Sequence, residues 1–85
     1  MPQVARVGDA GSHGGTIITG SEDVLTNDRG TARVGDTYNC PIHGPNPIVT
    51  GSPDITANSR PVARVGDQTA CGATIVAGSP DTLAN

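Results

Sequence analysis

Aromatic side chains are nearly absent from this 85-residue chain, which has no Phe, no Trp and one Tyr, Tyr38. Aromatic rings bury more apolar area than aliphatic side chains, so a core of Val, Ile, Leu and Ala contributes less per residue. A chain this short forms one domain and buries only a modest fraction of its surface. The composition therefore predicts that the fold needs a staple besides its apolar core.

Basic residues and long apolar runs are also scarce. The chain has five basic residues, spread along its length, and a net charge of −3, so it lacks the basic stripe that nucleic-acid binding requires. It has no run of about 18 apolar residues that could form a membrane-spanning helix. Its first residues, Met1-Pro2-Gln3, do not begin a secretory signal peptide. If the protein acts outside its cell, it leaves by another route.

Glycine and proline, in contrast, exceed a fifth of the residues, and the glycines recur at fixed offsets that indicate internal repeats. A motif ending in Ala-Arg-Val-Gly-Asp occurs three times, at 4–9, 31–36 and 62–67. After each copy come a variable loop, a β-branched pair, a Gly-Ser-X-Asp segment and an Asn. The pairs are Ile17-Ile18, Ile48-Val49 and Ile75-Val76, and the asparagines are Asn27, Asn58 and Asn85. We predict one domain, 1–85, with repeats at approximately 4–30, 31–61 and 62–85.

The spacing within the repeats predicts how the domain closes. The two glycines of a repeat are 12 residues apart in the first and third copies and 16 in the second, whose variable loop therefore carries an insertion. Three short units are too few for a solenoid with capping repeats. Closure around a pseudo-threefold axis is the more natural arrangement.

The local patterns predict an all-β fold. Val-Ala-Arg-Val and Thr-Ile-Ile-Thr are short β-branched runs bounded by Gly, Asp and Ser, which is typical of brief strands and tight turns. No window has the apolar spacing of a helix, and the segment 23–27 could form one helical turn at most. The predicted core consists of the β-branched pairs and of the valines that precede Gly-Asp. Those valines are Val7, Val34 and Val65.

All the His and Cys residues of the chain lie in the variable loops. His13, Cys40 and Cys71 each stand five residues after the Gly of a Gly-Asp pair, and His43 lies in the insertion. A pseudo-threefold fold would bring these loops to one end of its axis. Two Cys and two His form a common closed tetrahedral set, and two thiolates neutralise a divalent charge. We predict one structural Zn²⁺, preferred over iron because the site suits a metal without redox chemistry, and this metal would be the staple.

Other interpretations of these residues stay open at this point. Cys40 and Cys71 could form a disulfide in an oxidising compartment, and isolated histidines are often solvated surface side chains. A Cys near a His also suits a nucleophile and its base, but no Asn or Asp stands out as an orienting partner. A catalytic zinc normally has three protein ligands and an open position, so the pattern favours a structural site over an enzyme.

Aspartate and arginine recur together in the motif. An Asp that follows a turn glycine commonly bonds the backbone two residues on, which favours a structural role. The spacing of these aspartates fits neither an EF-hand loop nor a calcium-binding nonapeptide repeat. The arginines could pair with carboxylates around the axis, although exposed ion pairs contribute little. The residues are Asp9, Asp36 and Asp67 with Arg6, Arg33 and Arg64.

The repeated motif resembles the PAAR repeat, named for Pro-Ala-Ala-Arg. Pro61-Val62-Ala63-Arg64 is the nearest copy, whereas Gly30-Thr31-Ala32-Arg33 lacks the proline and Gln3-Val4-Ala5-Arg6 has Pro2 directly before it. The strings Ala-Arg-Val-Gly-Asp, Ser-His-Gly-Gly and Gly-Ser-Pro-Asp followed by Asn extend the match over essentially the whole chain. The resemblance implies a small cone of short strands with a zinc ion near its point.

The resemblance also carries over a ligand set. Family members with three His and one Cys at the zinc map by loop position onto His13, Cys40, His43 and Cys71. This chain departs from that pattern because it has two Cys.

A spike-tip function is the further implication of the resemblance. In that family the base of the cone caps a trimeric β-helical spike, one copy per trimer, in type VI secretion systems or contractile phage tails. We therefore expect a non-enzymatic protein, made in the bacterial cytoplasm without a signal peptide and delivered outward, in transient contact with the target-cell membrane. Effector proteins are further partners that this role allows, and nucleic acid is not expected. The alternatives are a zinc-binding adaptor or binding module and, less favoured, a metal-dependent toxin or enzyme.

Overall fold

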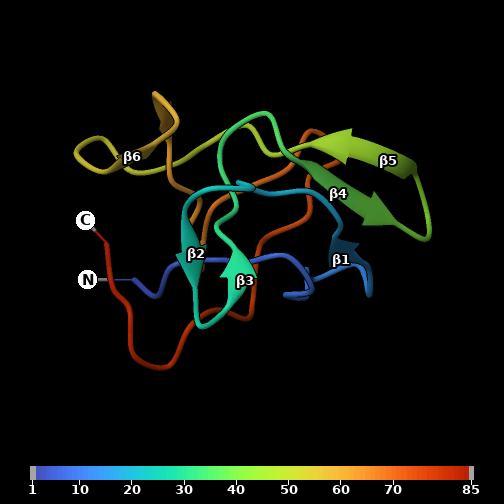
Figure 1. The fold of residues 1–85 in the computed structure, drawn as a ribbon. Helices are drawn as coiled ribbons and strands as arrows, with labels where there is room; N and C mark the ends of the chain where they lie inside the picture. Colours follow the sequence, from blue (N-terminus) through green and yellow to red (C-terminus); the bar gives the residue numbers. More distant parts are fainter. Residues whose placement is uncertain (1, 85) are drawn as a thin grey trace.

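The computed structural model describes residues 2–84, which form a small all-β fold. The strands are β1 (Thr16–Ile17), β2 (Leu25–Thr26), β3 (Arg29–Gly30), β4 (Thr37–Cys40), β5 (Gly44–Pro47), β6 (Thr56–Ala57) and β7 (Arg60–Pro61). They form a three-stranded sheet in the order β1-β4-β5 and two hairpins, β2-β3 and β6-β7, joined by extended loops (Figure 1). The described residues include no helix, and hence none long and apolar enough to cross a membrane. The all-β prediction is confirmed.

Three hydrogen bonds close the repeats into a ring. Ala5 donates its N–H to the carbonyl of Ala63, Ala63 to that of Ala32, and Ala32 to that of Ala5, at 2.9–3.0 Å. All three alanines are fully buried. The backbones converge on the axis here, so a larger side chain at these positions would overpack the centre. The predicted pseudo-threefold closure is confirmed, and the alanine of each Ala-Arg-Val-Gly-Asp motif marks the axis.

Two tight hairpins and the chain ends complete the base of the ring. The β2-β3 and β6-β7 turns have two central residues in the left-handed region, as type I′ turns require. These residues are Asn27 (φ 53°), Asp28 (65°), Asn58 (51°) and Ser59 (65°). In the third repeat the two chain ends supply the corresponding pair, because Gln3 bridges Leu83. Asn85, the last repeated asparagine, lies outside the described residues.

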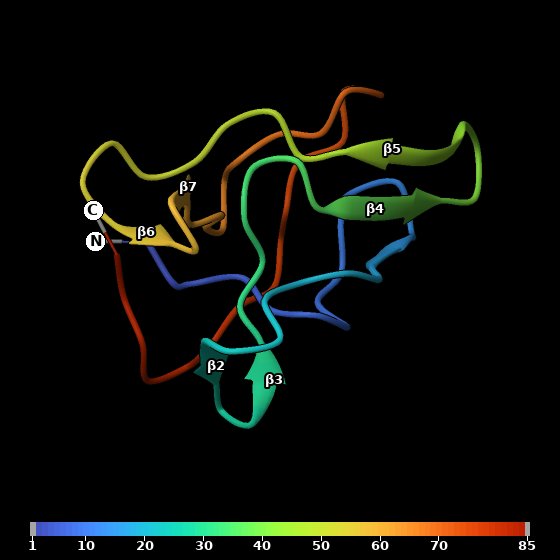
Figure 2. The same cartoon turned by 45° about the horizontal axis from the view of Figure 1, so that its top comes forward.

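The two ends of the molecule differ in what they carry. Figures 1 and 2 place the β4–β5 turn at one end and the chain termini, with the β2-β3 and β6-β7 hairpins, towards the other. The segment 23–27, which could have formed one helical turn, instead contains β2. The repeat boundaries at 4–30, 31–61 and 62–85 stay a prediction.

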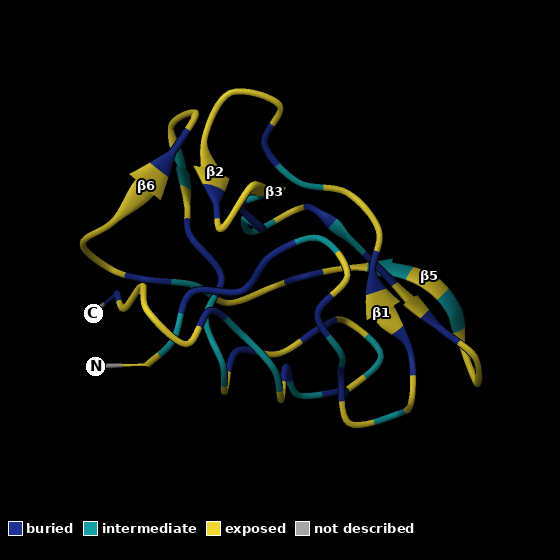
Figure 3. Cartoon of the chain, turned by 60° about the horizontal axis from the view of Figure 1, so that its bottom comes forward, coloured by how far each residue is buried: buried dark blue, intermediate teal, exposed yellow. Residues whose placement is uncertain are grey.

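The core prediction is right for one residue of each β-branched pair. Ile17, Ile48 and Ile75 are 1% exposed, whereas the residue after each of them is about half exposed, because neighbouring side chains in extended backbone point to opposite sides. Those exposed residues are Ile18, Val49 and Val76. The valines before Gly-Asp are only half-buried. Tyr38, which the core prediction omitted, is completely buried, and Figure 3 shows the buried segments running through the middle of the molecule.

Each motif aspartate bonds backwards to the arginine three residues before it, and not to the backbone two residues on. Asp36 accepts hydrogen bonds from the backbone N–H and the guanidinium of Arg33 at 2.7–3.0 Å, and the other two repeats have the same arrangement. The aspartates are buried, and the side chains of their arginines are only 10–19% exposed. These pairs therefore hold each tight turn in place more firmly than the exposed ion pairs that the sequence suggested.

Asp36 receives a further bond from the hydroxyl of Thr19 in the preceding repeat. Burial would raise the pKa of Asp36, but its hydrogen bonds with the Arg33 side chain, Thr19 and the Arg33 N–H, together with the charge of Arg33, lower this pKa from its ordinary value of 3.8. The resulting stabilisation is complete above the unfolded-state pKa and is lost as the pH falls through the folded-state pKa.

Asp36→Asn is accordingly expected to lower the free energy of unfolding by about 1.5–3 kcal/mol at neutral pH. The difference from the parent protein should shrink on acidification below about pH 4. Urea titrations of the two proteins at matched pH values measure it. Asp54→Asn, at an exposed carboxylate of the same repeat, is the control. A difference that stays constant from neutral pH to pH 3 would contradict this assignment.

Candidate metal centre

The insertion in the second repeat lengthens one hairpin and places two ligand-type side chains at its tip. β4 pairs with β5 in the register that sets Cys40 opposite Gly44, and the turn 41–43 connects them. In the first and third repeats the corresponding hairpins close after one bridge and a short turn. Cys40 thus occupies the last residue of a strand, and His43 occupies the turn that follows.

A glycine in the left-handed region follows His13, His43 and Cys71, each of which lies at the tip of a hairpin. These glycines are Gly14 (φ 90°), Gly44 (80°) and Gly72 (89°). Glycine adopts this conformation without steric cost and lets a short hairpin loop close. The His-Gly and Cys-Gly dipeptides in the loops are the sequence signal for these tight turns. His13, Cys40 and Cys71 stand at the same offset in their repeats but are not fully equivalent in space. Cys40 lies in a strand, whereas the other two lie in turns.

The four side chains converge on one point. The Sγ of Cys40 lies 3.5 Å from Nδ1 of His13 and 3.5 Å from Nδ1 of His43, and the Sγ of Cys71 lies 3.7 Å from Nδ1 of His13. All four ligand atoms lie within 4.8 Å of one another. In a tetrahedral site with ordinary Zn–S and Zn–N bonds, sulfur and nitrogen ligands are about 3.6 Å apart. The spacing of the cluster thus fits one tetrahedral metal ion bound through Nδ1 of both histidines.

The surroundings of Cys71 favour its thiolate, the form that binds metals. Burial raises the pKa of this thiol, but hydrogen bonds with the Thr69 hydroxyl, the Ala73 N–H, Cys40 and His13 lower it to about 6. The contact between Thr69 Oγ1 and Cys71 Sγ is 3.2 Å. Cys40 is buried, whereas Cys71 and His13 are half-buried and His43 is exposed. The cluster is therefore open to solvent on one side and closed on the other.

Hydrogen bonds tie each ligand loop to the two others. The bonds are Gly15 N to Tyr38 Oη (3.0 Å), Cys71 N to Asn46 Oδ1 (3.1 Å) and Ser12 N to Thr74 O (2.8 Å). Tyr38 lies two residues before Cys40, and its ring fills the space beside Gly11, where an added Cβ would stand 2.5 Å from the ring. These contacts position the loops around the point where the ligand atoms converge.

The other interpretations of the ligand residues find less support. Both cysteines are free thiols, so no disulfide joins them in this structure. The cluster contains no carboxylate that could orient a catalytic histidine. Within residues 2–84, no second group of three or more His, Cys, Asp or Glu side chains comes together, so the motif aspartates do not form a cation site.

Comparison with known proteins places the repeats and the His/Cys cluster in one family. A search of curated proteins found no match. The family model described as the PAAR motif matches residues 7–77, which includes the predicted metal ligands and parts of all three repeats. On this match, the chain belongs to the PAAR-motif family.

Proposed function

We propose that this chain is the tip of a puncturing spike, with a zinc ion fastening its point and its base capping a trimeric β-helical spike protein. Membership of the PAAR-motif family supports a structural role of the spike-tip type. The observation that carries the finer proposal is the presence of a pseudo-threefold apolar pocket at the end opposite the His/Cys cluster. The end with the pocket then suits a partner with threefold symmetry, and the end with the His/Cys cluster suits a metal ion.

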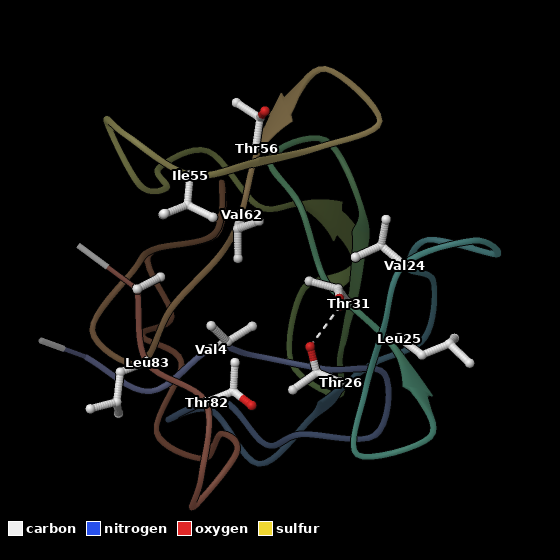
Figure 4. A pocket seen from close by; sticks show the side chains of 11 residues that line it. Val4, Val24, Leu25, Thr26, Thr31, Ile55, Thr56, Val62, Thr82 and Leu83 are labelled. Atoms are coloured by element: carbon white, nitrogen blue, oxygen red, sulfur yellow. Dashed lines mark hydrogen bonds between the residues drawn. The ribbon is translucent and has the colours of Figure 1, made fainter.

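The base pocket draws equivalent residues from all three repeats (Figure 4). It has a volume of about 240 Å³. Its floor is formed by Val4, Thr31 and Val62, which are buried, and its walls and rim by Val24, Leu25, Ile55, Thr56, Thr82 and Leu83, which are exposed. Leu25 and Leu83 are 57% and 48% exposed, so a partner could cover them. Exposed apolar residues gathered around a hollow are characteristic of protein-binding surfaces.

A trimeric β-helix fits this pocket by symmetry and by chemistry. Its blunt end presents the same side chains three times around a threefold axis, so one copy of this chain can make a similar contact with each of the three subunits. Apolar residues of the spike end would fill the pocket, and the cap would cover strand edges that are otherwise free to pair with other chains. We infer a stoichiometry of one cap per trimer.

The metal in this proposal is structural Zn²⁺, held by His13, Cys40, His43 and Cys71. Zinc supplies a rigid tetrahedral link between the three ligand loops. A point tied in this way resists splaying under axial force, because the loops cannot separate without breaking coordination bonds. Four protein ligands leave no open position for a substrate, which fits a role without catalysis. The protein would be made in the bacterial cytoplasm and delivered outward with the spike into contact with the target-cell membrane.

Leu25→Asp is expected to weaken capping about 100-fold. Burying a leucine is worth about 1.5–3 kcal/mol, each 1.4 kcal/mol is a factor of ten in affinity, and a buried unpaired charge adds a further cost. Binding to the purified trimeric spike protein measures the affinity, and the mass of the complex in solution measures the stoichiometry. Val49→Asp is the matched control, because Val49 is 48% exposed but does not line the pocket.

Full binding by Leu25→Asp, or one cap bound per single spike chain, would contradict the capping proposal. Tight binding to an unrelated protein in place of the trimer would favour the alternative, a zinc-binding adaptor. The metal content of both variants should equal that of the parent protein, because neither substitution replaces one of the four predicted ligands.

A further inference from the structure

Cys40 and Cys71 form a pair of neighbouring free thiols that is open to chemistry besides metal binding when no metal occupies the cluster. They are the only cysteines of the chain, both are free, and their sulfur atoms lie at most 4.8 Å apart. They come from different repeats and differ in exposure, since Cys40 is 1% exposed and Cys71 is half-buried. Two thiols this close, with one reachable from solvent, are arranged for two-electron oxidation.

We propose that Cys40 and Cys71 are a modification site for two-electron oxidants such as hydrogen peroxide, which convert the metal-free cluster into an intramolecular disulfide. The disulfide itself requires only the two thiols and the oxidant. Its competition with metal rests on the proposed zinc site, because a sulfur that binds zinc cannot at the same time form the disulfide.

The reaction proceeds in two balanced steps. The more exposed Cys71 thiol attacks hydrogen peroxide, the O–O bond breaks, and a sulfenic acid and one water form. The Cys40 thiol then attacks the Cys71 sulfur, the S–O bond breaks, and the oxygen leaves as a second water. The two thiols lose two electrons and two protons in total, and the peroxide is reduced to two waters.

The local structure assigns different roles to the two cysteines. Cys40 is held at the end of β4, where pairing with β5 fixes its backbone. Cys71 lies in a short turn next to Gly72, whose N–H donates to the carbonyl of Thr69. The sulfurs of a tetrahedral zinc site are about 3.8 Å apart and those of a disulfide about 2.05 Å, so the turn has only a short distance to move. Cys71 is therefore the residue oxidised first, and Cys40 resolves the sulfenic acid.

The disulfide would hold two of the three ligand loops together in the absence of metal. It links the loops of the second and third repeats and leaves the loop of His13 joined to them by hydrogen bonds and by the packing of Tyr38 beside Gly11. A protein that lost its metal in an oxidising compartment would then keep two of its three loops together. We expect the oxidised metal-free protein to unfold about 10 °C above the reduced metal-free protein.

The test is oxidation of the full chain, stripped of metal by a chelator, with dilute hydrogen peroxide. We expect both thiols to disappear together, the intact mass to fall by two hydrogen atoms, and dithiothreitol to reverse the change. Peptide mapping should join the segments that contain Cys40 and Cys71. The Cys40→Ser variant should instead stop at a sulfenic acid on Cys71, which dimedone traps.

Two controls separate proximity in the fold from random collision of thiols. The same oxidation in concentrated urea should be slower, and so should oxidation of Cys71→Ser combined with Thr82→Cys, which moves the second thiol to the exposed rim of the base pocket. Equal rates in native buffer and urea, or sulfinic acid in place of the disulfide, would overturn the proposal.

Oxidation in the presence of zinc distinguishes this proposal from the proposed metal site. Equimolar zinc should slow disulfide formation about tenfold or more, because both sulfurs would be occupied. If the disulfide forms but zinc has no effect on its rate, the thiol pair is established and the zinc site is contradicted. If zinc binds and no disulfide forms without it, the thiol proposal fails and the zinc site stands.

Discussion

Cys71→Ser is expected to lose the metal ion and most of the folding stability of this chain. Apparent binding free energies of structural zinc in small domains are about 10–16 kcal/mol, whereas the total stability of a domain is about 5–15 kcal/mol. The larger of the two buried apolar clusters contains one aromatic residue and is otherwise built from isoleucine, alanine and a cysteine. Without the metal, this core should keep the chain folded by only a small margin.

Elemental analysis and thermal unfolding of protein purified without chelator measure this effect. The parent protein should contain about one zinc per chain, and the variant should contain little and unfold at a much lower temperature, as the parent should in excess chelator. Ala70→Ser is the control, because it introduces a hydroxyl at an exposed position of the same loop and leaves the ligands intact. Cys71→His should recover part of the metal content, since imidazole is also a zinc ligand.

An unchanged zinc content in Cys71→Ser would show that this cysteine is not a ligand. A variant that loses zinc but keeps its unfolding temperature would show that the metal is bound without stabilising the fold. Either result would remove the physical reason for placing a zinc staple at the point of the molecule.

The features that the sequence predicted well are those that the repeats encode by position. A motif that recurs three times fixes which segments are equivalent, and three equivalent segments in a small domain have few ways to pair other than a ring. The same reasoning led to the loop cluster, because equivalent loops of a ring meet at one end. Cys40, Cys71 and His13 lie together for this reason, although Cys40 occupies a strand end and the other two occupy turns.

The features that the sequence did not predict depend on packing in three dimensions. Tyr38 has no counterpart of its type in the other repeats, where Gly11 and Thr69 stand at the same offset. Its burial follows from the lengthened hairpin and from small residues opposite its ring, such as Gly11. The burial of the Arg–Asp pairs arises because neighbouring repeats cover each turn. The base pocket combines the two chain ends with two hairpins, and no local pattern indicates that Gln3 pairs with Leu83.

The second large effect is expected for Tyr38→Ala. Tyr38 is the largest fully buried side chain, and removing a buried aromatic ring costs about 3–5 kcal/mol when the cavity cannot collapse. Urea unfolding of the zinc-loaded protein measures the loss. Tyr38→Phe is the control, because it keeps the ring and removes only the hydroxyl that accepts the bond from Gly15, which is worth about 0.5–1.5 kcal/mol.

A double-mutant cycle with Gly11→Ala tests whether the tyrosine ring itself is responsible. The added methyl group would stand 2.5 Å from the ring in the parent protein, so Gly11→Ala alone should be destabilising. In the Tyr38→Ala background the same methyl group enters vacated space, and the combined loss should be smaller than the sum of the two single losses by about 1 kcal/mol or more. Additive losses would mean that the ring does not fill the space beside Gly11. The three repeats would then be held together by their repeated Ala and Ile residues, without an aromatic residue at the centre of the fold.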